Sequence, residues 1–349
     1  RCALRVVWDL GLFLLCVAGA TGLGRGGAPA RAHELAGELV LSGSPWIADA
    51  PTRIAEVEGL FDSESGGGVR VEYTDSGRSS LARMLAGDAD LALVAGVPLA
   101  LALLRAIPSA RPRAQWPVVL ASIALSNRTH QVVAHAGRGI EEPADLAGRR
   151  VGLLQDSSGH FGWDRFAAFH RIPPESVCLV DAPPGEWAEG LVEGRFDAAV
   201  CWSPHCEAVE ARLGEAARIF SLLALDSVSW LLVSTRHLVE QHPARVERVL
   251  QGYARAIERI YADPEQAMAK AGLEPGVAQS GLVIWELALD WPVLANLEAK
   301  LDWASSRLGA VRPELLPSDY ILSAPLQRVS PSAVVLPPRL PNAPRRGGP

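Results

Sequence analysis

The stretch SSLARMLAGDADLALVAG, residues 79–96, joins a helical pattern to a strand pattern and indicates the fold class. Its first part predicts a helix that ends at Gly87, a residue type favoured at helix C-termini. Residues 89–96 are almost continuously apolar, as strands buried on both faces are. A strand covered on both faces predicts a parallel sheet with helices on either side, so this stretch favours an α/β protein.

The same alternation of strand and helix extends in both directions from this stretch. Upstream, the patterns predict a strand at 37–44, a helix at 49–61 and a strand at 66–74. Downstream they restart, with strands at 130–136, 177–182 and 196–202 and a helix at 158–170. We therefore expect two successive α/β units.

Length, composition and net charge indicate how many domains the chain can form and which functions are disfavoured. A chain of 349 residues with 49% hydrophobic and 21% charged residues is long enough for two ordinary domains. The net charge of −6 and the lack of a Lys/Arg stripe along any predicted helix argue against nucleic-acid binding.

The N-terminal segment has the layout of an export signal. Arg1 and Arg5 precede a short apolar run, residues 10–20, that ends in small residues. A Gly/Pro-rich stretch follows, so we expect residues 1–32 to be a signal peptide and flexible tether, and the mature protein to be soluble and periplasmic or extracytoplasmic. The bulky Leu15 disfavours a lipid anchor on Cys16. Export or a buried N-terminal helix could each explain the run, and export is the interpretation we favour.

Candidate ligand-binding residues follow the predicted strands. In open parallel sheets, ligands bind beyond the carboxyl ends of the strands. Hydroxyls, glycines and aromatic side chains recur at these places in both units. The candidates are Ser44, Trp46, Gly77, Arg78 and Val97 in the first unit, and Ser157, Ser158, Gly159, His160, Trp202, Ser203 and His205 in the second.

The segment 157–159 opens a predicted helix and is the sharpest of these candidates. Small hydroxyl residues and Gly159 would leave the first backbone N–H groups of the helix accessible to an anion. The same serines also suit a simple N-cap, and the local sequence does not separate the two roles. Likewise, Arg78 could pair with an anionic group or be a solvated residue at a helix start.

The cysteines near His205 suggest a metal site at first reading. Cys201, His205 and Cys206 offer three donors, but adjacent His205 and Cys206 do not share one tetrahedral ion easily, and no second ligand pair is visible. No G-x-S-x-G elbow and no G-x-G-x-x-G loop follow a predicted strand. We therefore expect no catalytic residues, no metal and no cofactor.

Three segments together resemble a known family. They are GDADLALVAGVP (87–98), ADLAGRRVGLLQDSSGHF (144–161) and LVEGRFDAAVCWSPH (191–205). In this order they resemble the substrate-binding proteins of ABC importers for nitrate, sulfonates, taurine and thiamine-pyrimidine precursors. The resemblance covers roughly residues 38–309.

The resemblance implies a two-lobed type 2 periplasmic-binding-protein fold, each lobe a mainly parallel sheet flanked by helices, joined by two crossover strands. Lobe 1 would comprise residues 33–125 and 229–324, lobe 2 residues 126–228, and residues 325–349 a Pro-rich tail. By the same analogy, Asp226 would reach the ligand from the hinge.

The implied function is capture of a small anionic or heteroaromatic molecule, such as a sulfonate, nitrate or a pyrimidine precursor, by a monomer that delivers it to an ABC permease. Relatives often carry Glu where this chain has Ser203, which removes a negative charge near the expected cleft. Two alternatives stay open: an enzyme that uses the same cleft, and a ligand sensor not coupled to transport.

Overall fold

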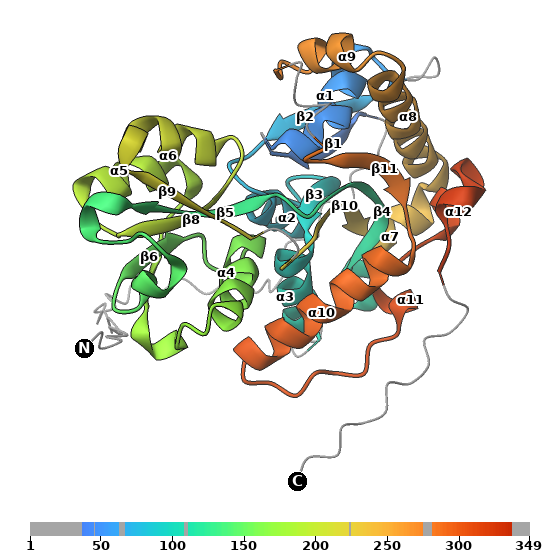
Figure 1. Ribbon diagram of the computed structural model, residues 1–349. Helices are drawn as coiled ribbons and strands as arrows, with labels where there is room; N and C mark the ends of the chain where they lie inside the picture. Colours follow the sequence, from blue (N-terminus) through green and yellow to red (C-terminus); the bar gives the residue numbers. More distant parts are fainter. Residues whose placement is uncertain are drawn as a thin grey trace, which may run out of the picture.

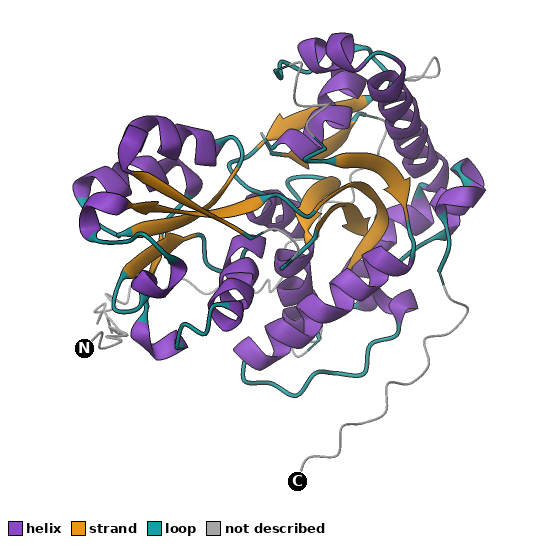
Figure 2. Ribbon diagram, in the orientation of Figure 1, coloured by secondary structure: helices purple, strands orange, loops and turns teal. Residues whose placement is uncertain are grey.

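The computed structural model describes residues 37–44, 46–62, 67–107, 111–222, 225–274 and 281–336, and the expected signal peptide and tether (1–32) lie outside these ranges. The described chain forms two α/β bodies, each built on one sheet (Figure 1). We call the body on the six-stranded sheet lobe 1 and the body on the five-stranded sheet lobe 2. Helices flank both sheets (Figure 2), which confirms the predicted α/β class.

The sheet of lobe 1 has the strand order β11-β4-β10-β3-β1-β2. Its strands are β1 (Leu39–Gly43), β2 (Val69–Tyr73), β3 (Leu91–Ala95), β4 (Pro117–Ser126), β10 (Val228–Thr235) and β11 (Ile284–Ala288). Its helices are α1 (Ala50–Val57), α2 (Gly77–Ala86), α3 (Gly96–Ala106), α7 (Arg236–Gln241), α8 (Pro243–Ala262), α9 (Pro264–Lys270), α10 (Trp291–Arg307), α11 (Pro317–Tyr320) and α12 (Ala324–Val329).

The sheet of lobe 2 has the strand order β7-β6-β8-β5-β9. Its strands are β5 (His130–His135), β6 (Arg150–Leu153), β7 (Cys178–Asp181), β8 (Ala198–Trp202) and β9 (Ala217–Ser221). Its helices are α4 (Ser158–Phe169), α5 (Trp187–Glu193) and α6 (His205–Leu213). Hydrophobic clusters cover both faces of this sheet, one around Phe166 and one around Trp187.

Both sheets are mixed, which refines the expectation of mainly parallel sheets. β1, β2 and β3 pair in parallel, as do β6, β7 and β8, because helices return the chain between them. The chain leaves lobe 1 through β4 into β5 and returns through β9 into β10. The outgoing and returning strands run in opposite directions, so β4 pairs antiparallel with β10 and β5 with β9.

Part of the segment expected to be a C-terminal tail is folded into lobe 1. Helix α12 contacts α8, and Leu326 is fully buried in the core of lobe 1. The backbone N–H of Leu289 donates to the Ala333 carbonyl at 2.8 Å, and that of Val335 donates to the Leu289 carbonyl at 2.9 Å. An apolar contact and backbone hydrogen bonds therefore hold residues 324–335, despite their proline content.

No helix within the described ranges is long and apolar enough to cross a membrane.

Candidate ligand-binding site

One pocket is lined by residues of both lobes. Most of its lining residues stand at or just after the carboxyl ends of strands, where ligands bind in open α/β sheets. From lobe 1 they are Ser44, Trp46, Ser76, Gly77, Arg78, Ala95, Pro98, Val228 and Trp230; from lobe 2 and the β4–β5 connection they are Thr129, His130, Leu154, Ser157, Ser158 and Trp202.

A buried carboxylate, Asp49, supports the lobe 1 wall from behind. Its Oδ2 accepts a hydrogen bond from the Ser44 backbone N–H at 2.9 Å, and its Oδ1 accepts from the Thr52 hydroxyl at 2.8 Å. The Trp230 indole N–H lies 3.4 Å from the same Oδ1. Burial raises the pKa of Asp49 from 3.8 to about 6, against the lowering effect of these hydrogen bonds. Asp49 thereby fixes two pocket-lining residues, Ser44 and Trp230.

The N-terminus of α2 enters the pocket from lobe 1. Ser76 is the N-cap, and its Oγ accepts a hydrogen bond from the Ser79 N–H at 3.3 Å. A Cβ on Gly77 would lie 2.7 Å from Cη2 of Trp230, so only glycine allows the helix to approach this indole so closely. Arg78 donates to the Gln155 carbonyl at 2.8 Å and so connects α2 to lobe 2.

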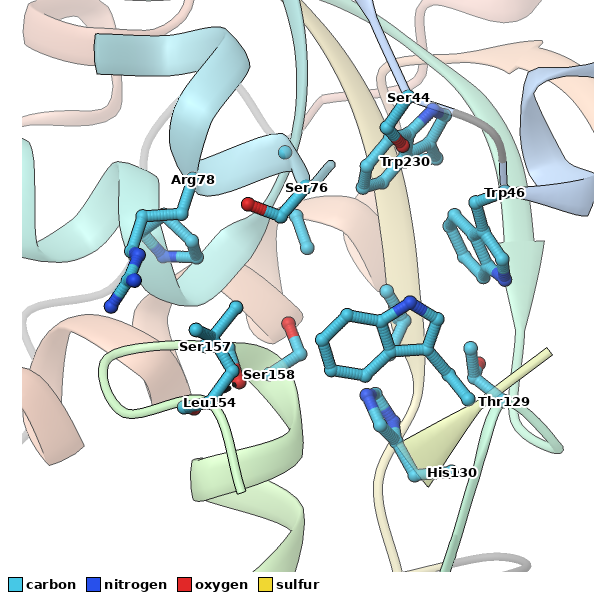
Figure 3. A pocket seen from close by; sticks show the side chains of 15 residues that line it. Ser44, Trp46, Ser76, Arg78, Thr129, His130, Leu154, Ser157, Ser158 and Trp230 are labelled. Carbon is cyan, nitrogen blue, oxygen red and sulfur yellow. Dashed lines mark hydrogen bonds between the residues drawn. The ribbon is translucent and has the colours of Figure 1, made fainter. Parts of the chain in front are cut away.

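The N-terminus of α4 enters from lobe 2. The Ser157 hydroxyl is used within the protein, because it donates to the Leu154 carbonyl at 2.6 Å and accepts from the His160 N–H at 3.4 Å. The neighbouring Ser158 is 6% exposed, and its hydroxyl has no hydrogen-bond partner among the described residues. In Figure 3, Ser76 and Ser158 reach the pocket from opposite sides. Two helix N-termini therefore face one space, an arrangement that suits an anion. The Ser76 hydroxyl donates to the Asp75 carboxylate at 3.1 Å, so of these two hydroxyls that of Ser158 is the one left for a ligand.

Aromatic rings line the rest of the pocket. The ring centroids of Trp46 and Trp230 lie 4.7 Å apart in an edge-to-face arrangement. Trp202 packs edge-to-face on the fully buried Trp187 at 4.6 Å and lies 5.7 Å from the ring of His130. Burial, with a smaller contribution from the charge of Lys300, lowers the pKa of His130 to about 3, so its imidazole is neutral near pH 7.

Seven of the thirteen residues predicted from sequence line this pocket: Ser44, Trp46, Gly77, Arg78, Ser157, Ser158 and Trp202. Gly159 lies directly beside it, since a Cβ there would meet His130 and Trp202 atoms at 3.5 Å. Their convergence follows from the shared position of these residues at strand ends and helix starts.

The other five predicted residues lie elsewhere. Val97 is fully buried in α3. His160 is buried and packs edge-to-face on Trp303 of α10 at 5.4 Å. Ser203 is half-buried, and His205 packs on Trp187 at 5.7 Å.

Asp226, expected at the ligand from the hinge, instead forms a buried ion pair with Lys300. Burial raises the pKa of Asp226 and lowers that of Lys300, while their mutual attraction opposes both changes.

Several lining residues were not among the predicted site residues. Ser76 and Pro98 belong to strand-end segments, and the position of Ser76 before Gly77 is a signal for an N-cap. Trp230 lies inside the apolar strand β10, where the sequence pattern predicts a core residue. Thr129 and His130 come from the connection into β5, and no local signal marks them as pocket residues.

Cys201 and Cys206 are not among the residues that line the pocket. Cys201 and Cys206 are buried free cysteines, and burial raises the pKa of the Cys206 thiol. Among the described residues, no group of three His, Cys, Asp or Glu side chains could hold a metal ion.

Comparison with known proteins places the chain in a family. The family model described as NMT1/THI5 like matches residues 50–267. The chain belongs to this family. A curated relative, the taurine-binding periplasmic protein of Escherichia coli (strain K12), is 25% identical over 218 residues, which cover 62% of this chain and 64% of the relative. The match thus spans less than two thirds of the relative's length.

Solved structures share the fold. The periplasmic aliphatic sulphonate binding protein SsuA from Escherichia coli gives a TM-score of 0.63 at 18% identity, with 79% of this chain and 94% of that chain covered. The periplasmic nitrate-binding protein NrtA from Synechocystis PCC 6803 gives 0.64 at 12% identity, with 86% and 89% covered. These matches confirm the two-lobed periplasmic-binding-protein fold predicted from the sequence.

Proposed function

We propose that this protein is the extracytoplasmic solute-binding component of an ABC importer, and that it binds a small organic anion between its two lobes. The observation that carries the proposal is the pocket itself. Lobe 1 contributes to it a helix N-terminus and two tryptophans, and lobe 2 a helix N-terminus and Trp202. A ligand that contacts both lobes favours the closed arrangement over an open one. The family and the names of its relatives support the same function.

The proposal also covers how the two lobes move relative to one another. The chain passes between the sheets at residues 127–129 and again between β9 and β10. We propose that these crossings form the hinge, and that residues 33–125 with 229–324 and residues 126–228 move as two lobes. The working form is a monomer, exported by its N-terminal segment, that docks on a membrane permease.

Ligand capture is tested with the purified full chain. Native mass spectrometry of freshly prepared protein should detect a bound small molecule. A thermal-shift screen of sulfonates, carboxylates, nitrate and pyrimidines should give at least one solute that raises the melting temperature and changes tryptophan fluorescence. The proposal fails if neither experiment detects a ligand. Conversion of a bound solute into a product, followed by NMR, would contradict the transport function and favour an enzyme.

A further inference from the structure

The aromatic side of the pocket is rigid and contains rings from both lobes. Asp49 holds the Trp230 indole N–H, and Trp46 stands edge-on against this ring at 4.7 Å. On the lobe 2 side, the buried Trp187 supports Trp202 at 4.6 Å. Rings that other residues hold in place lose little conformational entropy when a ligand binds. A flat apolar body would therefore gain most from this part of the pocket.

The polar groups of the pocket are suited to a negative charge. The Ser158 hydroxyl at the start of α4 has no hydrogen-bond partner among the described residues. The free N–H groups at the starts of α2 and α4 only donate. Arg78 adds the one cationic side chain among the described lining residues. Donors without acceptors at two helix N-termini favour an anionic group.

No acidic side chain lines the pocket in the described part of the chain. The buried carboxylate behind the wall, Asp49, already accepts hydrogen bonds from Ser44, Thr52 and Trp230. A ligand ammonium taken out of water would therefore find no carboxylate to pair with, at a large desolvation cost. This distinguishes the pocket from one built for a zwitterion such as an aminosulfonate.

The polar and aromatic groups are separated along the pocket. In Figure 3, Arg78 lies at one end, Trp46 lies at the other, and Ser76 and Ser158 lie between them. A ligand with an anionic group at one end and a ring at the other would match this order. On the basis of the proposed solute-binding function, we infer that the solute is an aromatic monoanion without an ammonium group, with its ring against the tryptophans and its anionic group at the starts of α2 and α4.

A panel of matched solutes tests this inference by isothermal titration calorimetry at one pH and ionic strength. The panel is benzenesulfonate, benzoate, ethanesulfonate, taurine and glycine betaine. Benzenesulfonate or benzoate should bind about tenfold or more tightly than ethanesulfonate, because only the aromatic solutes contact the rings. The better of these two aromatic anions identifies the head group. Taurine and glycine betaine should bind more weakly than ethanesulfonate.

The possible negative results distinguish failure of this inference from failure of the proposed solute-binding function. Tighter or equal binding of taurine or glycine betaine overturns the inference and leaves the solute-binding function intact. The same holds if a solute of the wider screen binds and neither aromatic anion does. If nothing in the wider screen binds, the function itself fails together with the inference.

Variants of Trp202 test whether this side chain is responsible for the preference for aromatic solutes. Trp202→Leu should lower the affinity for benzenesulfonate about tenfold and reduce its advantage over ethanesulfonate, whereas Trp202→Phe keeps a ring and should retain most of that advantage. Trp291→Leu is the matched control, because Trp291 is 52% exposed and is not part of the lining. Circular dichroism checks that each variant is folded. An unchanged solute preference in folded Trp202→Leu would overturn the placement of the ring.

Discussion

Two of the contacts between the lobes differ in whether the protein itself pairs their charged groups. The first is the α4–α10 contact, formed by His160, Phe161 and Asp164 of α4 with Lys300 and Trp303 of α10. The Trp303 indole N–H donates to Asp164 at 2.8 Å, and the Lys300 Nζ lies 4.4 Å from the ring centre of Phe161 while it pairs with Asp226. The charged groups of this contact are paired by the protein itself, and of the atoms of His160 the buried Nε2 has no hydrogen-bond partner among the described residues.

The second contact is the pocket. Here the Trp46, Thr129 and Ser158 donors have no partner in the described part of the protein, although Trp46 and Ser158 are almost fully buried. Buried donors without acceptors are costly, and an anionic group at the start of α4 would satisfy that of Ser158. The α4–α10 contact and the Arg78–Gln155 hydrogen bond therefore join the lobes without a ligand, whereas the Ser158 hydroxyl contributes to closure only when a ligand is bound.

Removing the Lys300 charge should have the largest effect, because it breaks the contact that needs no ligand. Lys300→Met leaves Asp226 buried without its cation, and we expect the free energy of unfolding to fall by about 3–5 kcal/mol in urea denaturation. Lys270→Met is the matched control. Its ammonium pairs with Glu58 near the surface, so the loss should stay below about 1 kcal/mol.

A double variant separates charge from packing. Replacing both partners, Lys300→Met with Asp226→Leu, should recover much of the stability, because no unpaired charge remains buried. If the double variant is no more stable than Lys300→Met alone, the pair contributes through packing, and the α4–α10 contact does not differ from the pocket in the way described.

The pH dependence of stability should reveal the carboxylate behind the pocket. Asp49 is held by neutral donors, and burial raises its pKa from 3.8 to about 6 in the folded protein. Between these values the folded state binds more protons than the unfolded state, so this group's contribution to stability is fully present below about pH 4 and is lost as pH rises through about 6. The full change is on the order of 3 kcal/mol.

Asp49→Asn tests this assignment in denaturant titrations at pH 4, 5, 6 and 7. The variant lacks the titrating carboxyl, so its free energy of unfolding should fall less between pH 4 and 7 than that of the unmodified protein. Equal pH profiles for the two proteins would show that another group is responsible.

The sequence predicts those pocket-lining residues whose place in the fold follows from the local strand and helix pattern. Ser44, Gly77 and Ser157 follow strands or open helices, and strand ends at one edge of a sheet must converge. Trp230 could not be found in this way. It lies in an apolar strand and reaches the pocket because β10 pairs with β3, far away in sequence, and because Gly77 leaves room for its ring.

Contacts between residues far apart in sequence also explain why Asp226 lies outside the pocket. Asp226 stands at the predicted crossing, but Lys300 follows it by 74 residues, and only the packing of α10 brings them together. The mixed character of the sheets has the same origin, since it depends on how the crossing strands return. Local periodicity identifies a strand and does not specify its neighbours.

The smallest expected effects come from two adjacent serines at the start of α4. One hydroxyl is bonded within the protein and the other is not, so the pair tests directly whether a ligand completes the pocket. Ser157 uses its hydroxyl inside the protein as the N-cap, so Ser157→Ala should lower the free energy of unfolding by about 1 kcal/mol. The Ser158 hydroxyl has no described partner, so Ser158→Ala should change stability by less than about 0.5 kcal/mol.

Ligand affinity should show the opposite order. Ser158→Ala removes a donor that only the ligand can use, and we expect the affinity for the best solute of the panel to fall about threefold to tenfold in calorimetry. Ser157→Ala keeps that donor and should bind with nearly unchanged affinity once it is folded. If both variants lose stability and neither loses affinity, then both hydroxyls serve α4 alone, and the pocket is not completed by a ligand at this helix.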